Sequence, residues 1–181
     1  ALEAINLKVR SGEILGIAGV SGNGQSELIE VLSGQRIPSD GRIFIDGKPY
    51  EPERKLMDSF KVFGFSEEPL KNVAVPRMSV AENMAFRTFD KPPISPFRGW
   101  LSPAPMRQKA RDLIASYRVK TPSTEEPIEN LSGGNVQRAI LARELSGEVD
   151  ILIVANPCFG LDFASVAEIR AQIMDQRNRG A

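Results

Sequence analysis

The chain has 181 residues, which is the length of one domain and enough to bury a hydrophobic core. Lysine plus arginine (23) equal aspartate plus glutamate (23), so no charge excess points to a nucleic-acid partner. Histidine is absent, which excludes histidine metal sites and Ser-His-Asp catalysis, and the single cysteine, Cys158, cannot form an internal disulfide. No apolar run is long enough to span a membrane.

The first third of the chain predicts strands around one glycine-rich turn. Residues 4–9 alternate between apolar and polar side chains, which predicts a half-exposed strand. Residues 13–18 form an apolar run that is typical of a strand buried on both faces. A helix is predicted over 24–32. Residues 41–47 predict a strand that ends in an Asp-Gly hairpin turn, and 61–66 predict another strand.

The rest of the chain is predicted to be mainly helical. Helices are expected over 79–86, 105–117, 135–145 and 164–179, with a proline-rich loop over 91–105 and an apolar strand over 150–155. This order indicates an α/β fold with an insertion. We expect a core formed by residues 1–66 and 147–181, interrupted by a helical subdomain over 67–146.

The glycine-rich turn lies between the predicted strand 13–18 and the predicted helix 24–32. A turn of this kind brings backbone N–H groups at a helix N-terminus close to a bound phosphate, although glycine spacing alone also fits a plain turn. Its candidate phosphate-binding residues are Gly19, Ser21, Gly22, Asn23, Gly24, Gln25 and Ser26. The hydroxyl of Ser26 is a candidate ligand for Mg²⁺.

Two further segments of interest follow the glycine-rich turn along the chain. The first is Leu131-Ser132-Gly133-Gly134-Asn135, in which Ser132 is predicted to cap a helix and the glycines allow an anion to approach the backbone. Taken alone, this segment also fits an ordinary capped helix. In the second, the apolar run 151–154 leads into Ala155-Asn156-Pro157, and Gly160-Leu161-Asp162 comes shortly after.

Together these segments resemble the nucleotide-binding domain of ATP-binding cassette (ABC) proteins. The resemblance identifies 131–135 as the signature motif, 19–26 as the Walker A loop, 151–156 as Walker B and Asp162 as the D-loop aspartate. It implies a P-loop NTPase core, with a mixed, mainly parallel sheet, flanking helices and an inserted helical subdomain. The chain is expected to stop before the C-terminal strands of such a domain. The implied ligands are ATP or ADP with Mg²⁺.

The departures from the family pattern all affect the Walker side. Gln25 stands where the family has the Walker A lysine, Ala155 and Asn156 stand where it has two carboxylates, and Glu67 stands at the Q-loop glutamine. ABC domains pair head to tail, so that each site joins the Walker motifs of one domain to the signature of the other. The resemblance therefore implies a degenerate half with little or no ATPase activity alone, whose signature completes the site of a partner.

Other stretches resemble the second cassette of the duplicated ATPases that drive import of simple sugars and nucleosides. They are residues 12–19, 23–28 and 78–83, and the Gln137-Arg138 pair after the signature. The implied partners are another cassette on the same polypeptide and transmembrane permease subunits, at the cytoplasmic face of the membrane, without nucleic acid. The alternative is a soluble ABC protein that acts on ribosomes or DNA. The neutral charge and the short, proline-broken insertion argue against it.

Overall fold

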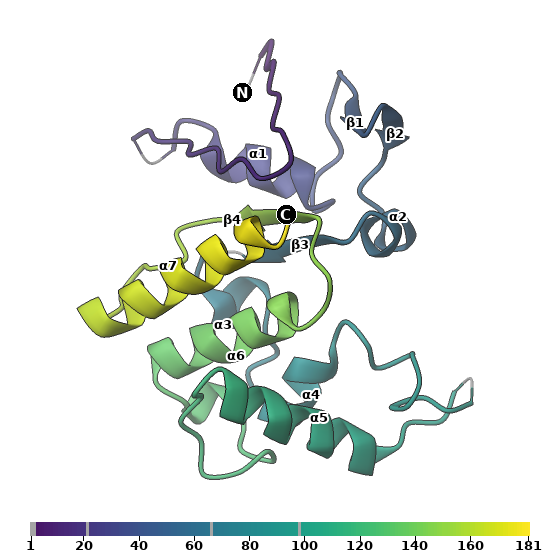
Figure 1. Ribbon diagram of the computed structural model, residues 1–181, viewed down its shortest axis with the longest axis vertical. Coiled ribbons are helices and arrows are strands. Elements are labelled where there is room, and N and C mark those ends of the chain that lie inside the picture. The colour runs from purple at the N-terminus through teal and green to yellow at the C-terminus, as the bar shows by residue number, and fades with distance from the viewer. Residues whose placement is uncertain (1–2, 21, 66, 98) are drawn as a thin grey trace. The chain divides into compact units, whose positions relative to one another are not determined.

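The computed structural model describes residues 3–20, 22–65, 67–97 and 99–181 (Figure 1). The chain divides into two compact units. Unit 1 consists of Ala1–Gly64, Glu148–Ala155 and Ala171–Ala181, and unit 2 of Phe65–Gly147 and Asn156–Arg170. Within the described ranges, no helix combines the length and the hydropathy that crossing a bilayer requires.

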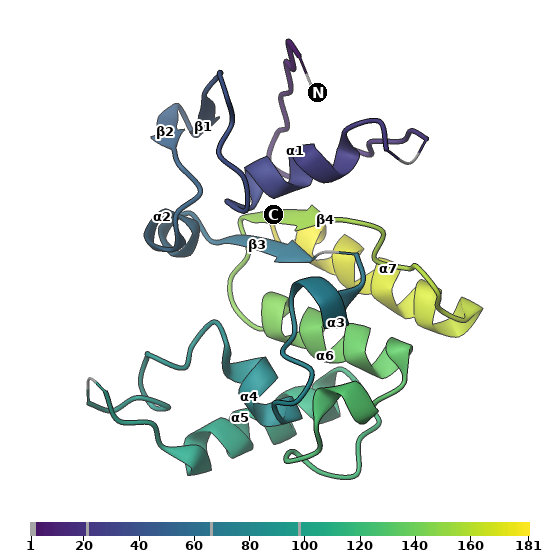
Figure 2. The ribbon, with the colours of Figure 1, turned by 180° about the vertical axis from the view of Figure 1, so that it is seen from behind.

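Unit 1 contains two small sheets. Strands β1 (Ile43–Ile45) and β2 (Lys48–Tyr50) form an antiparallel hairpin in which Ile43 lies opposite Tyr50. Asp46 and Gly47 connect them with φ values of 50° and 74°, the left-handed pair that Asp-Gly hairpin turns adopt. Strand β3 (Val62–Phe65) pairs with β4 (Ile151–Val154), and both arrows point the same way in Figure 2. The predicted hairpin and both of these strands are confirmed, although Ser66 lies outside the described residues.

The core of unit 1 lies between the hairpin and the β3–β4 pair. Tyr50, Met57 and Val62 are buried at its centre, and the rings of Tyr50 and Phe60 meet edge to face with centroids 5.9 Å apart. Helix α2 (Arg54–Ser59) contributes Met57, and isoleucines of β1 and β4 pack around the centre. Helix α1 (Gln25–Leu32) and the C-terminal part of α7 (Phe163–Asn178) also belong to this unit.

Unit 2 is helical and is organised around α6 (Gly133–Leu145). Nearly every residue of α6 from Val136 onward is buried, because α3 (Pro69–Asn72), α4 (Val80–Ala85) and α5 (Pro103–Ser116) pack against it. A 3₁₀ turn, η1 (Ile128–Asn130), immediately precedes the signature segment. Helix α4 begins with a capping box between Ser79 and Glu82, which satisfies two backbone N–H groups at its start.

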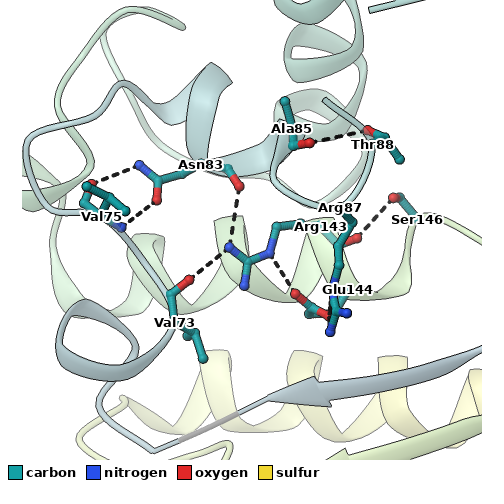
Figure 3. Close-up of polar contacts among 9 residues, drawn as sticks. All are labelled: Val73, Val75, Asn83, Ala85, Arg87, Thr88, Arg143, Glu144 and Ser146. Carbon is teal, nitrogen blue, oxygen red and sulfur yellow. Dashed lines mark hydrogen bonds and ion pairs between the residues drawn. The ribbon is translucent and has the colours of Figure 1, made fainter. Parts of the chain in front are cut away.

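Helix α6 carries two charged side chains into this core. Arg143 is 6% exposed and Glu144 is 0% exposed. The guanidinium of Arg143 donates from Nε to Oε1 of Glu144 at 2.6 Å and from Nη1 to the carbonyl of Val73 at 2.9 Å. Arg87 donates from Nε and Nη2 to Oε2 of Glu144 at 3.0 and 2.8 Å (Figure 3). Both carboxylate oxygens of Glu144 are therefore paired, which offsets much of the cost of burying the charge.

Asn83 ties the segment before α4 to the same cluster. Its side chain is fully buried, and Oδ1 accepts a hydrogen bond from the backbone N–H of Val75 at 2.8 Å. Its Nδ2 group donates to the carbonyls of Val75, Met78 and Ser79 at 3.0–3.1 Å. The carbonyl of Asn83 in turn accepts from Nη1 of Arg143 at 3.4 Å (Figure 3). One amide side chain thus holds 75–79 against α4.

The predicted helices are confirmed as α1, α4, α5, α6 and α7. Helix α5 begins at Pro103, inside the predicted loop 91–105, because proline is favoured in the first turn of a helix. The predictions of strands over 4–9 and 13–18 are wrong. Neither segment is a strand, and in the second Ile14 and Ile17 are each 53% exposed. A strand needs a neighbour for its backbone groups, and no described residue pairs with these segments.

Removing the Asn83 amide tests the polar cluster. We expect Asn83→Ala to lower the free energy of unfolding by about 3 kcal/mol, because buried backbone groups of 75–79 lose their partner. The control is Asn130→Ala, which removes only an exposed hydrogen bond to Glu126 and should change stability by less than about 0.5 kcal/mol. Urea unfolding of both variants measures the difference, and equal losses would contradict this role for Asn83.

Candidate functional site

The glycine-rich turn leads directly into helix α1. Gly22 and Gly24 have φ values of 86° and 104°, a conformation that glycine adopts without strain, and Gly24 is the N-cap residue of α1. No side chain caps α1, so its first N–H groups, which have no acceptor within the helix, remain available to an anion. Ser26 is exposed in the first turn. Ser21 lies outside the described residues.

Gln25 turns back onto the loop that precedes it. Its Nε2 group donates to the carbonyl of Val20 at 3.4 Å, a long hydrogen bond. The same nitrogen lies so close to Gly19 that a side chain at Gly19 would overlap it. At this position the family pattern has a lysine, whose ammonium is charged. The amide of Gln25 is neutral, and it contacts the backbone of its own loop.

The residues after β4 do not provide a complete magnesium site. Ala155 offers only a methyl group, and Asn156 adopts a left-handed conformation (φ 42°) in which its carbonyl accepts from the N–H of Phe159 at 3.0 Å. No group of three acidic, cysteine or histidine side chains that could hold a metal occurs among the described residues. Ser26 offers a hydroxyl, but no carboxylate stands at 155 or 156, so these residues fit Mg²⁺ poorly. Glu67 follows β3, and its carbonyl accepts from Nδ2 of Asn72 at 2.6 Å.

The signature segment forms the exposed start of α6. Leu131 is buried, and Ser132 occupies the predicted N-cap position, but its side chain makes no cap hydrogen bond. Instead, Oγ of Ser132 accepts from Nδ2 of Asn135 at 2.8 Å. The Oδ1 atom of Asn135 accepts from the N–H of Lys120 at 2.8 Å. The two side chains hold the turn in place and leave the first N–H groups of α6 without a side-chain partner.

The glycines of this turn are not required by the chain's own packing. Neither Gly133 nor Gly134 has a positive φ, and a Cβ built on Gly133 meets nothing within 4 Å. A Cβ on Gly134 would lie 3.4 Å from Cδ2 of Leu161, which is ordinary contact. Glycine within a helix costs about 1 kcal/mol relative to alanine. The fold would therefore accept alanine at both positions.

Asp162 caps helix α7. Its Oδ1 accepts from the N–H of Ser165 at 2.9 Å, and its Oδ2 accepts from the Ser165 hydroxyl at 2.9 Å. These bonds, first from the backbone N–H and then from the hydroxyl, hold the pKa of Asp162 below its ordinary value. The role in the D-loop that the resemblance implies for Asp162 stays a prediction.

Unit 2 brings the signature helix and the residues around Asp162 into contact. Nε2 of Gln137 donates to the carbonyl of Phe159 at 3.0 Å. Nη2 of Arg138 donates to Oγ of Ser165 at 3.0 Å and lies 2.9 Å from Oε2 of Glu168. The sequence singles out Gln137 and Arg138 but not their partners, because nothing local marks Ser165 or Glu168 as more than residues of an exposed helix.

The capping role of Asp162 predicts a pH dependence. Because its folded-state pKa lies below the unfolded value of about 3.9, the carboxylate stabilises the fold fully above that pH. The contribution is lost as the pH falls through the folded-state pKa. We therefore expect Asp162→Asn to unfold at lower urea concentration than the wild type near neutrality, and the gap to close at acidic pH. A gap that stays constant down to about pH 2 would contradict the role of the charge.

Comparison with known proteins places the chain in a family. The family model of ABC transporters matches residues 2–158. The guanosine import ATP-binding protein NupO of Bacillus subtilis (strain 168) is 38% identical over 178 residues, which are 97% of this chain and 34% of that protein. The nucleoside import ATP-binding protein NupA of Lactococcus lactis subsp. cremoris is 34% identical over 180 residues, 99% of this chain and 35% of that protein.

The chain thus spans about a third of the length of the curated relatives it matches. Among solved structures, the dimeric structure of the bacterial ABC transporter cassette MJ0796 has a similar fold, with a TM-score of 0.76 and 23% identity. The match covers 97% of this chain and 74% of that one. The fold is therefore the P-loop NTPase fold of ABC cassettes, and the chain belongs to the ABC transporter family as an ATP-binding domain.

Proposed function

We propose that the chain is the degenerate cassette of an ATPase that drives import of nucleosides or simple sugars. Its signature turn binds the nucleotide held by a partner cassette and completes the partner's hydrolysis site. Its own Walker side binds nucleotide weakly and hydrolyses little or none. The observation that carries this proposal is the exposed Ser132-Gly133 start of α6, where the fold itself has no need for a glycine.

The start of α6 is suited to stabilise a phosphate group outside this chain. The uncapped N-terminus of a helix carries partial positive charge and unpaired N–H donors. Apart from Arg138, the rest of α6 is buried from Val136 to Leu145, so these donors are held on a rigid element. Donors fixed before the reaction stabilise developing charge without reorganisation, which is the way a signature motif would assist hydrolysis.

The Walker side retains its backbone donors but lacks the side chains for hydrolysis. Gln25 supplies no charge to the β- and γ-phosphates, which removes a charge-assisted interaction of about 1.5–3 kcal/mol and weakens ATP binding roughly tenfold to a hundredfold. Ala155 cannot orient a water on Mg²⁺, and Asn156 cannot accept a proton from the attacking water. ATP or ADP would bind through backbone N–H groups at residues 22–26, with Ser26 as the one hydroxyl ligand for Mg²⁺.

The substrates and partners in this proposal follow from the relatives. NupO and NupA are named as guanosine and nucleoside import ATP-binding proteins, and other relatives are named for sugars such as ribose. Relatives about three times as long as this chain have room for a second cassette on the same polypeptide. The proposed assembly also includes transmembrane permease subunits, with the cassettes at the cytoplasmic face of the membrane.

The degenerate Walker side predicts that this chain alone has no ATPase activity above background. Gln25→Lys should tighten ATP binding about tenfold to a hundredfold, because it returns the missing charge to the loop. It should not restore hydrolysis, since Ala155 and Asn156 remain. Calorimetric titration with ATP and a phosphate-release assay measure the two effects. Turnover by the wild-type chain that is lost in Ser26→Ala would contradict the proposal.

The signature role predicts a strong effect of Ser132→Arg in the full-length ATPase assembled with its partner subunits. A long side chain at this exposed N-cap would block the N–H groups of α6 from the partner's nucleotide, and ATP turnover should fall at least tenfold. The matched control is Ser102→Arg, because Ser102 is also an N-cap without a side-chain cap bond, at the start of α5. Similar losses in the two variants would contradict the proposal.

A further inference from the structure

We infer that Arg138 is a positioning residue, which fixes the signature turn of α6 relative to the segment 159–165 through the hydroxyl of Ser165. The inference rests on the proposed function, because it concerns how the signature is held for a partner's nucleotide. It assigns roles to Arg138 and Ser165, which lie outside the residues 131–135 and Asp162 that the resemblance identifies.

The link is a continuous series of hydrogen bonds. Arg138 lies six residues after Ser132 on α6, and its Nη2 group donates to Oγ of Ser165 at 3.0 Å. The same hydroxyl donates its proton to Oδ2 of Asp162 at 2.9 Å. A hydroxyl has one proton to donate and can accept at the same time, so Ser165 is satisfied in this arrangement. The guanidinium of Arg138 is connected through it to the cap of α7.

A second set of contacts reaches the other end of the same segment. Gln137, which precedes Arg138 on α6, donates from Nε2 to the carbonyl of Phe159 at 3.0 Å. Leu161 Cδ2 and Ser165 Oγ lie 3.4 and 3.9 Å from the position that a Cβ of Gly134 would take. Two neighbouring side chains of α6 therefore hold 159–165 at both ends, and a signature glycine lies directly against it.

These polar contacts are buried, and they are not the packing of lowest free energy for a helix. Ser165 is 3% and Gln137 is 5% exposed, and the Arg138 side chain is 14% exposed. Nε of Arg138 and Oε1 of Gln137 are buried without a hydrogen-bond partner among the described residues. Apolar side chains would pack here without leaving polar atoms unsatisfied. The polar contacts are therefore better explained by the geometry that they impose than by stability.

The consequence is that the signature turn and the segment around Asp162 move as one body. The Ser165 hydroxyl sets their separation together with the Arg138–Glu168 and Gln137–Phe159 contacts. A small displacement of the first N–H groups of α6 would misdirect them from a nucleotide held elsewhere. Misplacing a functional group by about 1 Å can lower a rate by roughly a hundredfold. Arg138 need not touch the nucleotide to affect turnover.

The test compares Arg138→Gln and Ser165→Ala with the matched control Arg118→Gln. Arg118 also pairs with a helix α7 residue, Glu168, at 3.4 Å, but its side chain is 80% exposed and it makes no contact with Ser165 in the described structure. Amide hydrogen exchange is measured on the nucleotide-free, full-length protein. Both test variants should speed exchange about tenfold or more in 132–138 and 159–165, and the control should leave both segments unchanged. Faster exchange only at 162–166 would mean a local cap effect and would overturn the inference.

ATP turnover of the assembled ATPase provides the second readout, with Ser132→Arg as the reference variant. Arg138→Gln should lower kcat about tenfold and change the KM for ATP less than twofold, because it misplaces a group without removing it. The double variant with Ser165→Ala should lose no more than Arg138→Gln alone, since both act through one link. If Ser132→Arg lowers turnover but Arg138→Gln and Ser165→Ala do not, the inference fails and the proposed function stands. If Ser132→Arg has no effect, the proposed function fails, and with it the positioning role.

Discussion

The buried carboxylate of Glu144 is the constraint on which unit 2 depends. A fully buried charge is tolerated only when its oxygens are paired, and here Arg143 and Arg87 provide the partners. The Nη1 group of Arg143 also requires acceptors and finds them in the carbonyls of Val73 and Asn83. The segment after β3 and the end of α4 are therefore drawn onto α6, and the helix is fixed from its C-terminal half.

A helix fixed in this way keeps its N-terminus in position before any ligand binds. The first turn of α6 carries exposed Ser132 and Gly133, while Val136 and most later residues are buried. Function placed on a rigid element keeps its geometry better than function placed on a loop. The glycine-rich turn before α1 is different, since α1 has eight residues, none of them buried.

The departures of this chain from the family pattern distinguish functions that backbone groups can perform from functions that require particular side chains. Backbone N–H groups at the starts of α1 and α6 are present whatever the side chain, proline excepted, so anion binding is compatible with the sequence at both places. In the family pattern, two carboxylates orient and deprotonate the water on Mg²⁺, and a lysine places a fixed charge on the phosphates. Ala155, Asn156 and Gln25 cannot supply these groups. Under the proposed function, the Walker side would retain phosphate recognition and lack the groups for hydrolysis.

The sequence alone determined the features that arise locally. These are the helices α1, α4, α5, α6 and α7, the Asp46-Gly47 hairpin and the chemistry that Gln25, Ala155 and Asn156 cannot perform. Anion binding at the starts of α1 and α6 stays a prediction. Only the tertiary structure decided that residues 13–18 do not form a strand, since a strand exists only beside a partner. It also decided that Arg143 and Glu144 are buried and that Arg138 reaches Asp162 through Ser165. The contacts of Arg87 with Glu144, of Arg143 with Val73 and of Arg138 with Ser165 carry no local signal, because the two partners lie far apart in the chain and meet only when the helices pack.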